Sequence, residues 1–468
     1  MEFYKVLNDI LDKYGLKAAD LHKRTSLKRP YISKMLNGDL VPSSYDAVDA
    51  IIQAFDLELE DRIALTDSYL MTRTTGDSNI MDAAFRKMYT LKYPESADAK
   101  DLCSGTPENG KIISGGELIS AIRELVKNSK GSVDLFFVPL TSEPADRLCR
   151  AFGAMSESTV LNWFLPFYPD KREAVQNFSI FVNCLPVMAL KSCSLKKIGC
   201  DIRTMIKNSV FPFWIMNGKQ LVLFDKEMQN GQFFDDESII ALYAEKLGSV
   251  CSKALQPFII SLEKAEDILI CLGSWFRQSI TECYDYYSFS KVPCIVFDID
   301  KQDVENYTVE ETDDHEIAGM YVDFLRSTLM SSSRFIDIFS QDGLREYLDK
   351  EEWYEAGKHY SKSFPKKLRR LGVKSMVENC SNVNGSEILG LRIPGFDKTS
   401  YIGLNILSTG QLILLYDFDK KSAVIMANDR TLTDSLIAYI NELRKYKLIG
   451  SSEESLECVK AELAKRNI

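Results

Sequence analysis

The sequence has few of the residues that build metal and catalytic sites. Histidine occurs three times in 468 residues, at His22, His315 and His359. The eleven cysteines are scattered, with no Cys-x-x-Cys pair and no histidine at a zinc spacing. The sequence therefore predicts no metal site and no cofactor. Unpaired thiols spread through a large chain indicate a reducing compartment.

Long apolar runs are missing as well. The most apolar run, residues 178–190, contains Asn183 and Pro186. It is shorter than the roughly 20 residues that cross a bilayer as a helix. The first residues, MEFYKVLNDI, show no signal-peptide pattern. We therefore expect a cytoplasmic protein without a membrane partner.

The composition is that of an ordinary globular protein, with 45% hydrophobic and 26% charged residues. The length suggests about three domains, because one domain typically contains ~150 residues. The net charge is −10, from 57 basic and 67 acidic residues. This balance excludes a surface that binds nucleic acid everywhere, but it allows one local basic face.

One such basic stretch is LKAADLHKRTSLKRPYISKMLNG, residues 16–38. From Lys13 to Lys34 the sequence contains seven Lys or Arg residues and one acidic residue, Asp20. The apolar spacing predicts two short helices joined by a tight turn, within a compact all-α region of five helices. We expect these helices at residues 2–14, 17–24, 29–36, 45–55 and 60–72.

This stretch resembles the lambda-repressor-like, Xre/Cro-type helix-turn-helix family. The resemblance rests on Leu21, Thr25, Leu27, the run Ile32-Ser33-Lys34 and the closing Gly38, and it covers about residues 3–72. It implies that the second helix of the motif enters the major groove of an operator and that the protein binds double-stranded DNA as a homodimer. The residues that would contact DNA are Lys17, Lys28, Arg29, Tyr31, Ser33 and Lys34.

Three positions depart from the family pattern. Ala18 stands where Gln is common, and His22 replaces a small residue between the helices. Ser26 replaces the turn glycine, which would cost about 1 kcal/mol if the backbone kept a positive φ. These changes favour an alternative in which the motif serves protein interaction.

After the helical region the pattern becomes mixed α/β. Residues 1–76 form the predicted helix-turn-helix domain, and residues 77–111 a helix and linker, with the polar linker at 94–111. Two α/β parts follow, at residues 112–290 and 291–468. We expect residues 1 to about 93 to fold alone and proteolysis to concentrate in the linker.

Several apolar runs in the α/β region read as strands, at residues 132–139, 160–167 and 178–187. Asn217-Gly218 predicts a β-hairpin over residues 211–225. A similar pattern, strand, turn, strand and then apolar helix, recurs from residue 402 to 443. The recurrence indicates either an internal duplication or the repeat of a common unit by chance, and the sequence leaves both open.

The α/β region contains only incomplete matches to catalytic motifs. The run Asp298-x-Asp300 superficially resembles the first motif of haloacid-dehalogenase phosphatases, but Gln302 stands where Thr or Val belongs. His359 lacks the lysine of a phospholipase-D-type site, and no phosphate loop occurs. The basic run at residues 366–370 could contact nucleic acid or form a solvated helix face. We expect no enzyme activity.

The sequence thus predicts a multidomain transcription regulator of bacterial type. Its all-α helix-turn-helix domain precedes a larger α/β region that senses a small molecule or protein effector, or assembles the protein. Two alternatives remain: an enzyme or defence effector that carries a helix-turn-helix targeting module, and a helix-turn-helix domain repurposed for protein interaction.

Overall fold

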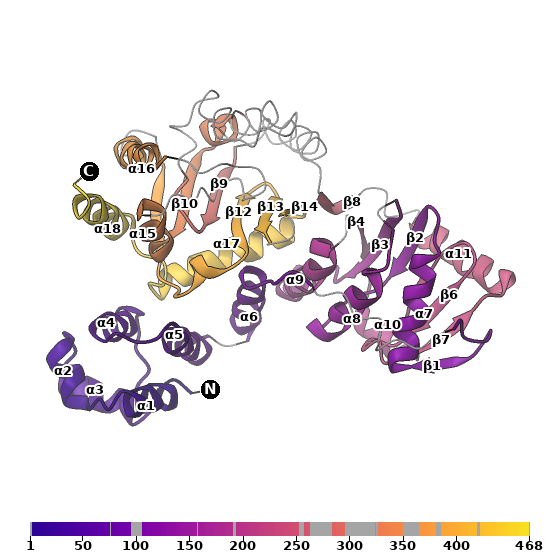
Figure 1. The fold of residues 1–468 in the computed structure, drawn as a ribbon, viewed down its shortest axis with the longest axis horizontal. Helices are drawn as coiled ribbons and strands as arrows, with labels where there is room; N and C mark the ends of the chain where they lie inside the picture. Colours follow the sequence, from indigo (N-terminus) through magenta and orange to yellow (C-terminus); the bar gives the residue numbers. More distant parts are fainter. Residues whose placement is uncertain are drawn as a thin grey trace. The chain divides into compact units, whose positions relative to one another are not determined.

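The computed structural model describes residues 2–467 apart from residues 75, 95–104, 157, 191–192, 252–256, 263–282, 295–322, 324–325, 350–364, 381–384 and 419–421. The chain forms two compact units (Figure 1). The first unit contains Met1–Thr90, Leu269–Thr409 and Asp434–Ile468. The second unit contains Leu91–Ile268 and Gly410–Thr433. An N-terminal helical region followed by a larger α/β region confirms the predicted fold class.

The helical region begins the first unit. Its helices are α1 (Phe3–Lys13), α2 (Ala18–Arg24), α3 (Arg29–Leu36), α4 (Asp46–Ala54), α5 (Leu59–Arg73) and α6 (Asp77–Tyr89). Each predicted helix lies within a few residues of an observed one. Apolar residues at helical spacing, such as Phe3, Leu7 and Ile10 of α1, face inward and are buried. Phe3 and Tyr45 both pack on the Tyr69 ring, with centroids 6.2 and 5.8 Å away.

The rest of the first unit is a mixed sheet with helices on both faces. Its strands run in the order β12 (Tyr401–Leu407), β9 (Asp285–Ser290), β10 (Arg334–Ser340) and β11 (Glu387–Leu391). Strands β9, β10 and β11 are parallel, and β12 is antiparallel to β9. One face packs on α15 (Gln341–Asp349), α16 (Lys366–Cys380) and α18 (Ser452–Ala464) through a core that includes Phe335, Leu344 and Val459.

Helix α6 belongs to the core of this unit. The Phe85 ring packs edge-on against Phe289 of β9, with ring centroids 5.0 Å apart. It also packs in a tilted arrangement against Tyr439 of α17 (Arg430–Lys445), with centroids 5.2 Å apart. The Tyr89 ring packs on Phe396 of the short helix η4 (Phe396–Lys398), at 5.0 Å. A fragment that ends after α6 would expose these rings to water, so the predicted independence of residues 1–93 conflicts with the packing of α6.

The second unit has its own mixed sheet. Its strands follow the order β1 (Ile112–Ser114), β7 (Asn230–Phe234), β6 (Leu221–Phe224), β5 (Phe213–Met216), β2 (Ser132–Phe136), β3 (Val160–Phe167), β4 (Cys193–Gly199), β8 (Pro257–Leu262), β14 (Ser422–Asn428) and β13 (Gln411–Asp417). Its helices are α7 (Gly115–Lys127), α8 (Ser142–Phe152), the short η2 (Lys171–Glu173), α9 (Ala174–Leu190), α10 (Ile202–Asn208) and α11 (Glu237–Cys251). Helices α7, α8 and α9 pack side by side on one face, and α11 covers aromatic residues on the other (Figure 1).

The prediction of a strand at residues 178–187 is wrong, because these residues lie inside helix α9. The helix is apolar on all sides and almost wholly buried, so its sequence has no helical stripe that would separate it from a buried strand. Two of its buried asparagines form hydrogen bonds inside the core. The Asn183 amide donates to the Pro139 carbonyl at 2.9 Å, and Asn177 binds both the amide and the carbonyl of Tyr168.

The predicted hairpin is present, and Asn217 shapes its turn. The Asn217 carboxamide oxygen accepts hydrogen bonds from the amides of Lys219 and Gln220, at 2.9 and 2.8 Å. The Asn217 amide donates to the Gln220 carbonyl at 3.0 Å, so the turn spans four residues. The side chain thus supplies the local hydrogen bonds that favour asparagine in turns.

The strand connectivity occurs twice along the chain. The strands β2, β3 and β4 are parallel neighbours, and β5 pairs antiparallel with β2. The strands β9, β10 and β11 repeat this arrangement, and β12 pairs antiparallel with β9. In each copy an antiparallel pair follows, β6 with β7 and β13 with β14, and then an apolar helix. This shared order favours two related halves over chance recurrence, while the predicted domain boundaries stay predictions.

Candidate nucleic-acid interface

The turn between α2 and α3 is held by side chains of the motif itself. The Thr25 hydroxyl donates to the Leu21 carbonyl at 2.6 Å and accepts from the Leu27 amide at 3.2 Å. The His22 Nδ1 atom lies 3.0 Å from the Leu27 carbonyl oxygen, so the imidazole also bridges the turn. His22 therefore has a structural role in place of the small residue that the family resemblance implied.

The Ser26 substitution carries no backbone strain. Within the described ranges, the non-glycine residues with positive φ are Met228, Lys447 and Asn467. Ser26 is described and is not among them, so the expected cost of a left-handed serine does not arise. The turn keeps its shape through Thr25 and His22.

Helix α3 is fixed at both ends and along its inner face. Pro30 lies in its first turn, where a backbone amide has no helical partner. Ile32 and Met35 are buried. After the helix Gly38 adopts φ of +81°, and a Cβ atom there would lie 2.9 Å from the Tyr4 ring. Only glycine fits both the dihedral angle and this close approach.

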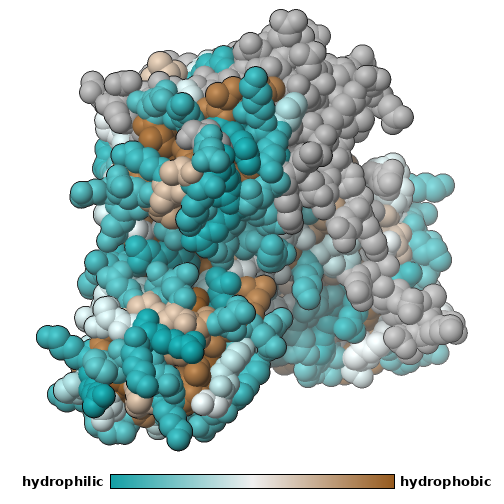
Figure 2. Space-filling model, turned by 60° about the vertical axis from the view of Figure 1, so that its left-hand side comes forward, coloured by the Kyte–Doolittle hydropathy of each residue, from teal (hydrophilic) through white to brown (hydrophobic). Residues whose placement is uncertain are grey.

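The outer side of the motif is exposed and basic. Of the residues expected to contact DNA, Lys17, Lys28, Arg29, Ser33 and Lys34 are exposed. Within the described part of the chain, none of their cationic groups forms an ion pair with an acidic residue. A cation without an internal counter-ion is available to a phosphate. Figure 2 shows that the surface on this side of the molecule is mostly hydrophilic, with small apolar patches.

Tyr31 lies apart from the other five residues. It is half-buried, and burial raises the pKa of its phenol while the nearby Arg73 guanidinium opposes that rise. Arg73 in turn lies over the ring of Tyr446, 5.4 Å from its centroid. Tyr31 therefore faces the end of α5 and is less accessible to DNA than the lysines and Arg29.

Several acids of the helical region form ion pairs outside the α2–turn–α3 motif. The Lys13 ammonium lies 2.7 Å from both Glu58 and Asp61, and the carboxylates raise the pKa of Lys13. Asp46 at the start of α4 lies 2.9 Å from Arg392 and 2.9 Å from Lys447. These three carboxylates therefore neutralise cations outside the motif and leave the lysines and Arg29 of the motif unpaired among the described residues.

The helical region attaches to the rest of the first unit through α4, α5 and α6. The Tyr45 amide donates to the Tyr446 carbonyl at 2.9 Å, and the Arg62 guanidinium of α5 lies 3.0 Å from Asp342 of α15. The Tyr439 hydroxyl of α17 donates to the buried Asp82 of α6 at 2.8 Å. These contacts use the helices that do not belong to the α2–turn–α3 motif, so docking leaves the basic side uncovered.

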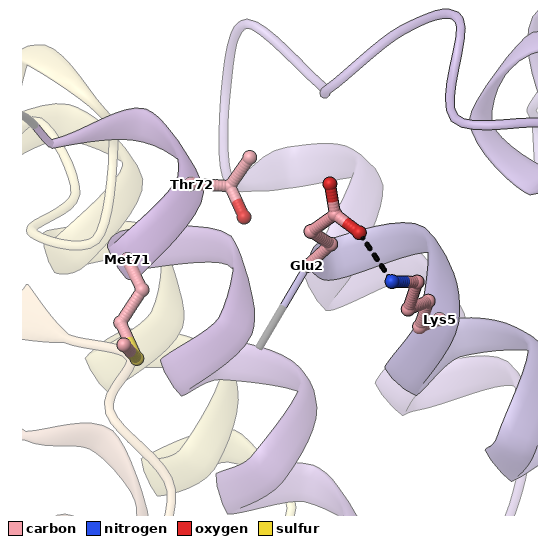
Figure 3. A pocket seen from close by; sticks show the side chains of 4 residues that line it. All are labelled: Glu2, Lys5, Met71 and Thr72. Atoms are coloured by element: carbon pink, nitrogen blue, oxygen red, sulfur yellow. Dashed lines mark ion pairs between the residues drawn. The ribbon is translucent and has the colours of Figure 1, made fainter.

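A hollow at the start of the chain lies on the same helical region. Its lining residues are Glu2, Lys5, Met71 and Thr72, from the start of α1 and the end of α5 (Figure 3). Glu2 and Lys5 form an exposed ion pair at 2.6 Å, and the Phe3 amide donates to the Thr72 hydroxyl at 3.2 Å. The hollow is open and weakly charged, and it brings no catalytic groups together.

Two arginines of the basic run at residues 366–370 form hydrogen bonds to the preceding helix. Arg369 is fully buried, and its guanidinium donates to the Tyr347 carbonyl. Arg370 donates to the Leu348 carbonyl at 3.4 Å. Both carbonyls belong to the last turn of α15, where backbone oxygens lack helical donors. The two arginines therefore cap α15. Lys367 is exposed, so a fully solvated face describes only part of the run, and its contact with nucleic acid stays a prediction.

The remaining sequence candidates lie outside the described residues, namely Asp298, Asp300, His315 and His359. Among the described residues, no three His, Cys, Asp or Glu side chains are grouped so that they could hold a metal ion. In those same residues, no helix has the length and apolar character needed to cross a membrane.

No family model and no curated protein matches the chain. Among solved structures, TrmBL2, described as an archaeal chromatin protein with a novel mode of DNA binding, is similar with a TM-score of 0.21 and 9% identity, over 51% of this chain and 87% of that chain. Phosphatidylserine synthase of Haemophilus influenzae Rd KW20 is similar with a TM-score of 0.23 and 8% identity, over 83% and 98% of the two chains. Likeness at these TM-scores carries no argument about function.

Proposed function

We propose that the protein is a cytoplasmic DNA-binding transcription regulator of the Xre/Cro type. The α2–turn–α3 motif binds an operator, and the α/β region regulates it without turnover of a substrate. The observation that carries the proposal is the exposed basic side of the motif, which is free of internal ion pairs among the described residues.

The roles of the residues follow from their positions. Arg29 and Lys28, at the start of α3, reach base edges or phosphates in the major groove. Ser33 and Lys34 project from the exposed side of the same helix. Lys17, just before α2, contacts the DNA backbone. Tyr31 is half-buried, so its contribution is to position α3.

Two copies of the chain, bound to paired half-sites, would double the contact area between protein and DNA. This larger area would account for specific binding by such a small motif. The α/β region is far larger than a DNA-binding motif needs, which favours a role in assembly or in sensing an effector. An effector regulates DNA binding only if it binds two conformations of the protein with different affinities.

The test is selection of binding sites from genomic DNA by the purified full-length protein, followed by footprinting. We expect protection of two half-sites about one helical turn apart, or a multiple of that distance. Binding should weaken steeply with salt, because phosphate contacts release counter-ions. The absence of any sequence preference at physiological salt would favour the protein-interaction alternative.

A further inference from the structure

Each of the two related halves ends its antiparallel strands with one apolar helix, α11 in the first half and α17 in the second. Both helices begin at an aspartate that accepts hydrogen bonds from the backbone amides two and three residues ahead. The two distances are 2.8 and 3.2 Å for Asp236, and 2.9 and 3.3 Å for Asp429. Counted from these caps, Leu242 of α11 therefore corresponds to Ser435 of α17.

The inner sides of the two helices correspond. In α11, Ile240 is buried, and the Tyr243 ring lies edge-on to Trp214 of β5 with centroids 6.2 Å apart. Their counterparts in α17 are Thr433 and Leu436, and both are fully buried. The two helices thus use the same positions for packing on their own half.

The outer side of α17 is covered by α6. The Tyr439 ring packs on Phe85 with centroids 5.2 Å apart, and its hydroxyl donates to Asp82 at 2.8 Å. Ser435, which lies one turn before Tyr439 on the same side, is buried as well. This side of α17 therefore lies beneath a second helix.

The outer side of α11 is exposed instead. Leu242 is 61% exposed, whereas Tyr439 on the corresponding side of α17 is 2% exposed. Ala241 and Lys246 are exposed beside Leu242. Helices that are apolar on two sides are ordinarily buried on both. In the described part of the chain, this side of α11 therefore has no cover comparable to α6.

The charges around this surface indicate the kind of partner. Glu245 lies on the same side of α11 as Leu242, and Asp235 and Glu237 lie at the start of the helix. These three acids are exposed, and none forms an ion pair with a described residue. A second copy of α11 would bring like charges together, which disfavours a contact between two copies. A basic amphipathic helix would match both the apolar and the acidic groups.

We propose that the outer side of α11, residues 238–245, is a docking surface for a basic amphipathic helix of a partner protein. The apolar ridge of that helix packs on Ala241 and Leu242, and its Lys or Arg side chains face Glu245 and the acids at the start of α11. The inference rests on the regulatory role proposed for the α/β region and names its surface and class of partner.

The probe for this surface is a fluorescently labelled synthetic peptide of leucine and lysine, with the leucines at helical spacing. Fluorescence anisotropy with the full-length protein, at constant ionic strength, should show saturable binding at one site. A peptide of the same composition in scrambled order should bind about tenfold more weakly or less, and so should a peptide with glutamate in place of lysine.

Substitutions on α11 test the position of the site. Leu242→Gln removes the apolar centre of the surface and should raise the Kd of the leucine–lysine peptide about tenfold or more. Glu245→Lys should raise it too, because it brings like charges together. Two matched controls in the same unit, Val210→Gln at a 79% exposed position and Glu108→Lys at an exposed acid, should leave Kd unchanged. Because Leu242 is exposed, its variant should keep the fold, which circular dichroism checks.

Absence of saturable binding overturns the surface, and so do equal effects of Leu242→Gln and Val210→Gln or equal binding of the ordered and scrambled peptides. Sedimentation velocity then compares the wild type with Leu242→Gln, and both should have the same mass. A dimer that dissociates in Leu242→Gln would assign the surface to a second copy and overturn the proposed partner. None of these measurements involves DNA, so failure of the surface is distinguishable from failure of DNA binding, which footprinting tests.

Discussion

The Tyr45 amide donates a 2.9 Å hydrogen bond to the Tyr446 carbonyl, so the first turn of α4 begins where α17 ends. The positive end of one helix dipole meets the negative end of the other. Lys447, in a left-handed conformation with φ of +61°, then places its ammonium 2.9 Å from Asp46. The hydrogen bond and the ion pair therefore join the end of α17 directly to the start of α4.

The first prediction concerns DNA. Replacing Arg29 and Lys34 by alanine should weaken operator binding, because both side chains are exposed and lack internal counter-ions among the described residues. Loss of a base-reading arginine costs about 1–3 kcal/mol. The measurement is fluorescence anisotropy with the footprinted site. The control double variant, Arg172→Ala with Lys226→Ala, should bind the site as the wild type does. If both double variants bind equally well, α3 does not contact DNA.

A second prediction compares two glycines after helices. Gly15 and Gly38 both have positive φ, +63° and +81°, so alanine at either position costs about 1 kcal/mol in free energy of unfolding. Among described atoms, nothing lies within 4 Å of a Cβ at Gly15, whereas one at Gly38 meets the Tyr4 ring. Gly38→Ala should therefore destabilise the helical region more than Gly15→Ala in thermal unfolding. Equal losses would mean that Tyr4 moves aside freely.

The third prediction concerns the cap of α15. Arg369→Ala should lower the free energy of unfolding of the first unit by about 2–4 kcal/mol, since it leaves the Tyr347 carbonyl without this donor and opens a void. Lys367→Ala, at an exposed position of the same helix, should change stability by less than about 0.5 kcal/mol. Hydrogen exchange of α15 measures both. If the two variants behave alike, Arg369 does not cap the helix.

A fourth prediction concerns pH. Burial raises the pKa of Asp337 in β10 to about 7, although its carboxylate accepts a 2.9 Å hydrogen bond from the Cys294 amide. In the unfolded chain the carboxyl has its ordinary pKa of about 3.8, so the folded state binds more protons between the two pKa values. Stability of the first unit should therefore fall as pH rises from about 4 to about 7.

Asp337→Asn keeps the shape of the side chain and removes its ionisation. The variant should show a smaller loss of thermal stability across that pH range and should be the more stable protein above pH 7. The control is Asp134→Asn, which makes the same chemical change on a strand of the second unit. This variant should lose thermal stability with rising pH as the wild type does. If the thermal stability of Asp337→Asn fell with pH as much as that of the wild type, another group would be responsible for the pH dependence.

Features governed by neighbouring residues could be predicted from the sequence. Thr25 and Leu27 shape the turn of the motif, Gly38 closes α3, and Asn217 makes its hairpin turn through residues two and three positions ahead. The amphipathic helices of the N-terminal region were predictable for the same reason, since one buried face repeats at the helical period. The exposed basic side of α2 and α3 follows directly from that pattern.

Only the tertiary structure decided which distant residues meet. Helix α9 is buried on every side, so no period in its sequence separates helix from strand. Arg392 and Asp46 are 346 positions apart, and nothing local marks either one as half of a contact. The sequence by itself determined the motif and its charge. The packing of α6 and the pairing of Arg392 with Asp46 depend on long-range contacts, which a single sequence does not encode in any local pattern.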